Sequence, residues 1–223
     1  MSSQISINVA KNTYIKNPET SELGKKIVSG SINLIDKLGF EQFTFKKLAT
    51  QIGSTEASVY RYFESKHQIL VYLTSWYWFW MDHQLLLCTL NINSPETRLN
   101  NAIKILTKEI KVNTELSYVD GVKLIRIINT DSSKIYLNKN VDIDNSYGYF
   151  IPYKKVVQLV CDIILEIKPT YKYPHIMVST VIEGTHHQRF FARHLPRLTN
   201  KIEGEDAISE FYLDIVFKTL TQK

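Results

Sequence analysis

The chain has 223 residues, a length sufficient to bury a hydrophobic core. Its composition, 44% hydrophobic and 22% charged, excludes a wholly disordered chain or a collagen-like repeat. Only 8 glycines and 6 prolines are present, and this scarcity of turn-forming residues favours helices over a β-sandwich. The net charge of +5, from 27 basic and 22 acidic residues, is compatible with nucleic-acid binding without requiring it.

The sequence gives no sign of secretion or membrane insertion. The N-terminus lacks an apolar segment of signal-peptide length, and the most apolar stretch, residues 69–81, is too short to span a bilayer. Cys88 and Cys161 are too few for a secreted disulfide framework and lie in apolar runs. We therefore expect a cytoplasmic protein with two buried thiols and no membrane partner.

Capping residues and apolar spacing predict a short-helix region at the N-terminus. Thr44 and Thr55 are placed to cap helices, and Gly39 and Gly53 are placed to end them. The predicted segments are a polar arm over residues 1–16 and helices over about 21–38, 45–52 and 55–63.

Longer helical patterns fill the rest of the chain. Ser65 and Gln68 predict a capping box, and Ser94-Pro95-Glu96 is a strong start signal. A loop is predicted over 138–151. The predicted helices cover about 65–89, 94–110, 115–137, 152–168, 174–194 and 205–221. We expect an all-α fold, with a three-helix domain in residues 1–65 and a six-helix bundle in residues 66–223.

Residues 44–66, TFKKLATQIGSTEASVYRYFESK, have the pattern of a helix-turn-helix. In such a unit the second helix enters the major groove of DNA and presents its N-terminal residues to base edges. Here those residues are small or polar, as close approach to DNA requires: Thr55, Glu56, Ala57 and Ser58.

With this motif in place, residues 20–70 resemble the DNA-binding domain of the TetR/AcrR family of bacterial transcriptional regulators. The family pattern has a Thr before the second helix, a Leu-Ala pair, a turn glycine, a run around two aromatic residues, and a following Lys. The matching residues are Thr44, Leu48-Ala49, Gly53, Ser58-Val59-Tyr60-Arg61-Tyr62-Phe63 and Lys66.

The resemblance implies roles for these residues. Tyr60, Tyr62 and Lys66 would bind DNA phosphates, and Thr44 would cap the second helix and reach the DNA backbone. Arg61, in the same run, joins this set of DNA-binding candidates. The two tyrosines are expected to be exposed. Val59 and Phe63 would be core residues.

Two departures from the family pattern stand out. Glu56 places an acid at the groove entrance, where it either accepts a hydrogen bond from a cytosine amino group or serves the helix dipole. Gln51-Ile52 replaces the small residue more usual before the turn glycine, which puts the helix packing there in question.

The aromatic run at residues 76–80 has two interpretations. It packs against its surroundings as core, or part of it lines a small-molecule cavity, as the resemblance implies for this region. The candidate ligand-binding residues are Trp76, Trp80, His83, Tyr118, Lys123 and Arg126.

The sequence gives little support for a metal site or an enzyme active site. Glu183 and His187 share a helical face, yet no third ligand follows at convincing spacing, so a polar subunit interface is favoured over a metal site. No nucleophile elbow, phosphate loop or dinucleotide fingerprint is present, and we expect neither an enzyme nor a bound cofactor.

The combined interpretation is a ligand-responsive dimeric repressor that binds a pseudo-palindromic operator on double-stranded DNA and is released by a small-molecule effector. The last two helices would pair with their symmetry mates through apolar residues: Ile176, Val181, Ile182, Phe190, Phe211, Ile215 and Leu220. The alternative is a ligand-binding or scaffolding bundle whose DNA module is degenerate. An activator of the same family would carry the same sequence features as a repressor.

Overall fold

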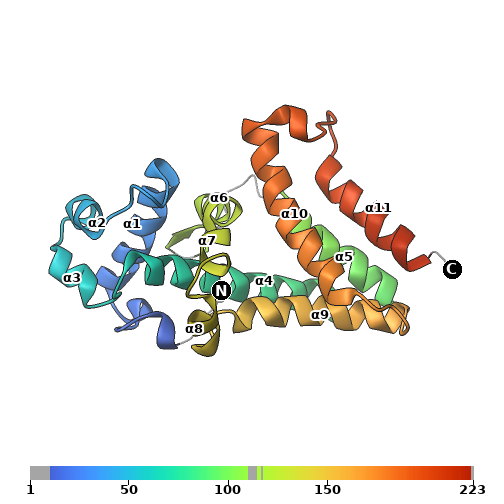
Figure 1. Ribbon diagram of the computed structural model, residues 1–223, viewed down its shortest axis with the longest axis horizontal. Helices are drawn as coiled ribbons and strands as arrows, with labels where there is room; N and C mark the ends of the chain where they lie inside the picture. The colour runs from blue at the N-terminus through green and yellow to red at the C-terminus, as the bar shows by residue number, and fades with distance from the viewer. Residues whose placement is uncertain (1–10, 110–114, 117, 222–223) are drawn as a thin grey trace. The chain divides into compact units, whose positions relative to one another are not determined.

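The computed structural model describes residues 11–109, 115–116 and 118–221 (Figure 1). The chain forms two compact units, which are described separately. The first unit comprises Met1–Phe79 with Ile110–Ile151, and the second comprises Trp80–Glu109 with Pro152–Lys223. Apart from one short hairpin, the regular elements of the described residues are helical, which confirms the all-α prediction.

The first unit contains the N-terminal helices and a hairpin. Its elements are η1 (Lys11–Thr13), η2 (Pro18–Thr20), α1 (Glu22–Leu38), α2 (Phe45–Ile52), α3 (Glu56–Tyr60), the first part of α4 (Lys66–Thr89), β1 (Glu115–Leu116), β2 (Val119–Asp120), α6 (Gly121–Asp131), α7 (Ser133–Tyr136) and α8 (Val141–Ser146). Helix α1 packs against α2 and α6. The predicted arm lies partly in residues 1–10, outside the described residues, and its end forms η1.

Predicted caps shape the helices of the first unit. Ser21 caps α1 by accepting a hydrogen bond from the Gly24 N–H at 3.1 Å. Thr44 caps α2 in the same way, accepting from the Lys47 N–H at 3.2 Å. Such a cap contributes about 1 kcal/mol, because it satisfies an N–H that has no partner within the helix.

A close approach of α1 and α2 depends on a glycine. A Cβ on Gly30 would lie 2.6 Å from the Ile52 Cγ2 and 3.0 Å from the Leu48 Cδ1. Leu48 is fully buried in this contact, and burying such a side chain contributes about 1.5–3 kcal/mol. The Gln51-Ile52 departure is therefore accommodated, with Ile52 packed directly on the α1 backbone.

The region 115–151 differs from the sequence prediction. The predicted helix over 115–137 begins instead at Gly121, because the Asp120 side chain caps α6 through the Lys123 N–H at 3.0 Å. Before it, β1 and β2 pair as an antiparallel hairpin, with Glu115 opposite Asp120. The predicted loop over 138–151 contains α8, a helix too short to show a clear apolar period.

The second unit is a set of longer helices. Its elements are the end of α4, α5 (Pro95–Thr107), α9 (Ile151–Ile167), α10 (Pro174–His194), η3 (Pro196–Leu198) and α11 (Ala207–Thr221). Helix α5 packs against both α10 and α11, which also contact each other (Figure 1). The Ser94–Pro95 start of α5 and the Pro174 start of α10 are as predicted.

The two compact units do not coincide with the boundary at residue 65 that the sequence predicts. The first unit gains the start of α4 and the segment from the hairpin to α8, because α6 packs directly on α1. Among the described residues, no helix is both long and apolar enough to cross a membrane. Cys88 and Cys161 are both free thiols, and Cys88 is half-buried rather than buried.

Candidate nucleic-acid interface

Helices α2 and α3 form the helix-turn-helix, and a glycine makes the turn between them. Gly53 has the left-handed conformation, with φ 64° and ψ 42°, which residues with a side chain rarely adopt. The chain then reverses, and the Ser54 N–H donates to the Ala49 carbonyl at 2.9 Å. The turn therefore fixes where α3 begins relative to α2.

The N-terminus of α3 is capped and open to solvent. Thr55 accepts from the Ser58 N–H at 3.2 Å, and its hydroxyl also bonds the Ser58 hydroxyl at 2.9 Å. Thr55, Glu56 and Ala57 are exposed, and Ser58 is half-buried. The residues expected to face base edges are thus accessible, with Ser58 and Thr55 held in one arrangement. Glu56 is the exposed first residue of α3, and both of its interpretations stay predictions.

The two tyrosines of the motif have different environments. Tyr60 is 49% exposed, and its ring packs edge-on against Phe45 with centroids 4.7 Å apart. Tyr62 is only 2% exposed, so the prediction that both are exposed is wrong for this residue. Its hydroxyl bonds the Ser21 hydroxyl at 2.8 Å, and its carbonyl accepts from the Ile15 N–H at 2.8 Å.

Lys66 is held by the protein itself. Its ammonium donates to the carbonyls of Phe40 and Glu41 at 3.3 and 3.2 Å, and it lies 4.8 Å from the centre of the Phe40 ring. These contacts tie the start of α4 to the loop between α1 and α2. A role in binding phosphate stays a prediction, and in this structure Lys66 positions the helix-turn-helix. Arg61 and Thr44 are exposed.

Arg126 and Lys123 hold α6 against α1 in this structure, and their predicted role in binding a ligand stays a prediction. The Arg126 guanidinium makes two hydrogen bonds to the Asp36 carboxylate, both 2.6 Å long. The hydrogen bonds to Asp36 raise the pKa of Arg126, although partial burial opposes them. Lys123 donates to the Asn33 side chain at 2.6 Å. These contacts provide each side chain with polar partners inside the first unit.

Tyr118 also has a partner within the first unit. Its hydroxyl donates to the Glu19 carboxylate, which accepts a second hydrogen bond from Tyr72 at 2.9 Å. Burial and the neighbouring Glu19 carboxylate raise the pKa of Tyr118. The carboxylate thereby joins η2, α4 and the hairpin.

The other ligand candidates are divided between the units. Trp76 lies in the first unit and Trp80 and His83 lie in the second. Trp76 and Trp80 are 4% and 5% exposed, as expected for core packing, and His83 is half-buried. Their role in binding a ligand stays a prediction.

The acidic and histidine residues of α10 form an internal pair. Glu183 lies 3.7 Å from the His186 Nδ1 and accepts a hydrogen bond from Tyr153 at 2.8 Å. Burial would raise the pKa of Glu183, but His186 and Tyr153 outweigh it and lower the pKa. His187 is exposed and stacks on Phe191. The described residues hold no cluster of three or more His, Cys, Asp or Glu that would bind a metal ion.

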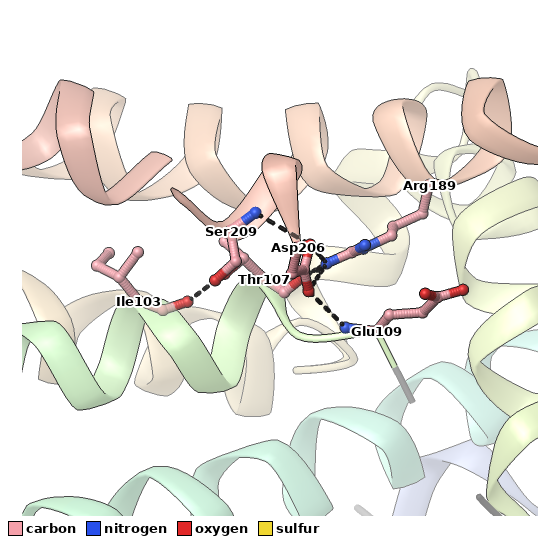
Figure 2. Close-up of polar contacts among 6 residues, drawn as sticks. All are labelled: Ile103, Thr107, Glu109, Arg189, Asp206 and Ser209. Atoms are coloured by element: carbon pink, nitrogen blue, oxygen red, sulfur yellow. Dashed lines mark hydrogen bonds and ion pairs between the residues drawn. The ribbon is translucent and has the colours of Figure 1, made fainter. Parts of the chain in front are cut away.

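A polar cluster fixes the start of α11 on α5 and α10 (Figure 2). The Arg189 Nη2 lies 2.7 Å from both Asp206 carboxylate oxygens and also donates to the Thr107 carbonyl. The Thr107 and Ser209 hydroxyls bond each other at 2.8 Å. Burial would raise the pKa of Asp206, but Arg189 and the Ser209 N–H outweigh it and lower the pKa.

The residues predicted for a dimer interface fall into two groups. Ile176, Phe211 and Ile215 are 64%, 54% and 41% exposed, so they are available to a partner. Phe190 is half-buried. The remaining three contribute to the core of the second unit, and their placement at an interface is wrong: Val181, Ile182 and Leu220.

Sequence reasoning missed residues whose partners lie far along the chain. Lys16, placed in a featureless arm, lies with its ammonium 5.2 Å from the centre of the Tyr62 ring. Asp36 lies on the part of α1 that faces α6. Neither belongs to a recognisable local motif, because each is defined by a contact with a residue many positions away.

Comparison with known proteins gives one family match. Residues 27–73 match the model of the tetR family of bacterial regulatory proteins. This segment runs from α1 into α4 and includes the whole helix-turn-helix. A search of curated proteins finds no match.

Solved structures resemble the chain over most of its length. AibR, in complex with isovaleryl coenzyme A and operator DNA, is 15% identical with a TM-score of 0.56, over 87% of this chain and 97% of that one. The ketosteroid transcriptional regulator KstR2 of Mycobacterium tuberculosis is 14% identical with a TM-score of 0.56, over 89% and 94%. A tetR-family regulatory protein from Rhodococcus RHA1 is 10% identical with a TM-score of 0.59, over 90% and 96%. These similarities show a shared fold.

Proposed function

We propose that the chain is a regulator of the TetR family, whose model matches residues 27–73, and that it represses transcription by binding a pseudo-palindromic operator as a homodimer. A small-molecule effector releases it from the DNA. Such a regulator acts on DNA in the cytoplasm and is not an enzyme. The observation that carries this proposal is the helix-turn-helix. Gly53 makes its turn in the left-handed conformation, Thr55 caps the second helix, and the N-terminus of that helix is exposed.

Sequence reading is assigned to the N-terminus of α3, through Thr55, Glu56, Ala57 and Ser58. Base contacts specify the sequence, whereas phosphate contacts position the helix. Tyr60 is well placed for the second task, because it is half exposed and its hydroxyl has no hydrogen-bond partner among the described residues. Thr44 and Arg61 are exposed on the same helix-turn-helix.

Dimerisation is assigned to the exposed apolar residues of α10 and α11. Ile176, Phe211 and Ile215 expose large apolar side chains that a second copy would bury. A two-fold dimer presents two α3 helices to half-sites one turn of DNA apart, about 34–36 Å. The operator is then expected to be pseudo-palindromic, because its symmetry mirrors that of the protein.

Regulation follows from a population shift between two conformations. In one conformation the spacing of the two α3 helices fits the operator, and in the other it does not. An effector that binds the second conformation more tightly weakens DNA binding, by no more than the ratio of its affinities for the two conformations. AibR, which has a similar fold, forms a complex with isovaleryl coenzyme A and operator DNA, and this supports a small-molecule site beside a DNA site in the present chain.

The second candidate is a ligand-binding or scaffolding bundle with a degenerate DNA-binding module. Two observations favour it: Glu56 brings a negative charge to the groove, and Tyr62 and Lys66 are occupied by contacts within the protein. The two candidates differ in one measurable property, which is sequence-selective binding to DNA.

The test is a selection of DNA fragments from the source genome with the purified full-length protein. Repeated rounds should enrich fragments that share a pseudo-palindromic site, and titration should show two protomers or a multiple of two per site. A matched selection with the Ala57→Asp variant should enrich no site, because a carboxylate there repels the phosphates. Equal recovery of all fragments by the wild-type protein contradicts the proposal and favours the scaffolding bundle.

A further inference from the structure

The segment before α1 covers the end of the helix-turn-helix. The Ile15 N–H donates to the Tyr62 carbonyl at 2.8 Å, and Ser21 bonds the Tyr62 hydroxyl at 2.8 Å. Between them, the Lys16 ammonium lies 5.2 Å from the centre of the Tyr62 ring. Residues 15–21 therefore form a strap over Tyr62, held at both of its ends.

The strap removes Tyr62 from the surface. Its side chain is 2% exposed, and its hydroxyl is engaged with Ser21, which is also the N-cap of α1. A phosphate contact by Tyr62 would require breaking this hydrogen bond and lifting the strap. The tyrosine hydroxyl is thus poorly available for the role that the family resemblance implies.

Lys16 brings a free cation to the same place. Its side chain is exposed and has no ion-pair partner among the described residues. The Tyr62 side chain beneath it holds the ammonium through a cation–π contact and a hydrogen bond, and an ammonium has three N–H donors, so donors remain for a further partner. Arg61, the residue before Tyr62, is also exposed and adds positive charge to this part of the surface.

We propose that Lys16 binds the DNA phosphate at the position that the resemblance assigns to Tyr62, and that Tyr62 serves as the platform for Lys16. An ammonium is well suited to this task because it combines a full charge with several donors. The contact is independent of base sequence, so Lys16 contributes to affinity and positioning and not to the choice of operator.

The inference rests on the proposed function and predicts a specific salt dependence. Each phosphate neutralised by a lysine contributes about 0.9 to the slope of log K against log salt concentration. The Lys16→Met variant keeps an apolar side chain on the tyrosine ring and loses the charge. We expect its slope to fall by about 0.9 per protomer, with an affinity loss of roughly eightfold per contact at 0.1 M salt.

The experiment is fluorescence anisotropy with the selected operator and a scrambled duplex at several salt concentrations. Lys16→Met should weaken binding to both duplexes by the same factor. The control is Lys104→Met, which removes an equal charge from an exposed position on α5 in the second unit. Its slope should equal that of the wild type. Tyr62→Phe should keep the wild-type slope and bind the operator within about twofold of the wild type, because the ring remains and the bond from the Ile15 N–H to the carbonyl of residue 62 still holds the strap beside it.

Three outcomes would overturn the inference. One is a Lys16→Met slope equal to that of Lys104→Met. Another is a tenfold loss of operator affinity in a Tyr62→Phe protein with wild-type circular dichroism and melting temperature, which would assign the phosphate to the tyrosine. A wild-type protein that binds neither duplex would overturn the proposed function as well, so failure of the two proposals is distinguishable.

Discussion

The contact between Arg126 and Asp36 is expected to couple α6 to α1 energetically. Both hydrogen bonds are 2.6 Å long and join a fork of donors to a carboxylate, the strongest geometry for such a pair. The Asp36 side chain is 16% exposed and the Arg126 side chain 35% exposed. The pair is therefore neither fully buried nor an ordinary surface ion pair.

These exposures set the expected magnitude. Hydrogen bonds to charged groups contribute about 1.5–3 kcal/mol when shielded, whereas exposed ion pairs contribute about 0.2–1 kcal/mol. Since solvent reaches about a third of the Arg126 side chain, we expect a coupling energy of about 1 kcal/mol, or roughly a fivefold change in an equilibrium constant. Lys123 and Asn33 bridge the same two helices nearby and retain part of the α1–α6 contact.

A double-mutant cycle measures this coupling. Asp36→Asn, Arg126→Met and the double variant are unfolded in urea and followed by circular dichroism, with Arg126→Lys as a variant that keeps the charge and loses the paired geometry. The two single variants should each be destabilised, and the double variant should be less so than their sum. A coupling energy within about 0.3 kcal/mol of zero, the usual scatter of additivity, would refute the reasoning.

Three further predictions concern DNA binding, pH and assembly. Tyr60→Phe should weaken binding to operator and scrambled duplexes alike by several-fold, with no change in salt slope because the hydroxyl is neutral; a changed sequence preference in anisotropy titrations would contradict a phosphate role. The pKa of Asp206 is lower in the folded than in the unfolded protein, so its ionised form stabilises the fold at pH values above the unfolded-state pKa of about 3.9. This stabilisation is lost as the pH falls through the folded-state pKa, and the free energy of unfolding should therefore decrease at pH values under about 4. Arg189→Met should largely remove that pH dependence, and an unchanged acid limb would argue against the pair. Phe211→Glu should shift sedimentation from dimer to monomer, because Phe211 is 54% exposed on α11, and a dimer that persists would place the interface elsewhere.

The features predicted correctly from the sequence are those that depend on neighbouring residues. Thr44 and Thr55 cap helices through N–H groups three residues away, and Gly53 adopts the left-handed conformation that its turn requires. Each of these is encoded within one turn of the chain. The position of the helix-turn-helix was therefore predictable, including the accessible end of α3.

The environments of particular side chains depend on residues far along the chain and were not predictable. Tyr62 is covered by Ser21, 41 positions earlier, and Arg126 is paired with Asp36, 90 positions earlier. An amphipathic pattern indicates which face of a helix is buried, but it does not identify the polar partner. For the same reason α8, only six residues long, gave no periodic signal.

The dimer prediction shows the same limit on a larger scale. Apolar spacing on α10 and α11 identified Ile176, Phe211 and Ile215, which are exposed, together with Val181 and Ile182, which are buried. A helix that contacts both its own core and a partner carries apolar residues on two faces. The sequence alone does not separate these faces, because their spacings overlap.

The most direct test of the account is the ratio of two dissociation constants for the wild-type protein at one fixed salt concentration. One is measured with the operator recovered by selection, and the other with a scrambled duplex of equal length and composition. The account predicts operator binding that is tighter by at least about a thousandfold, as specific recognition through a major-groove helix provides. Equal dissociation constants for the two duplexes would contradict its central claim, that α3 reads DNA sequence.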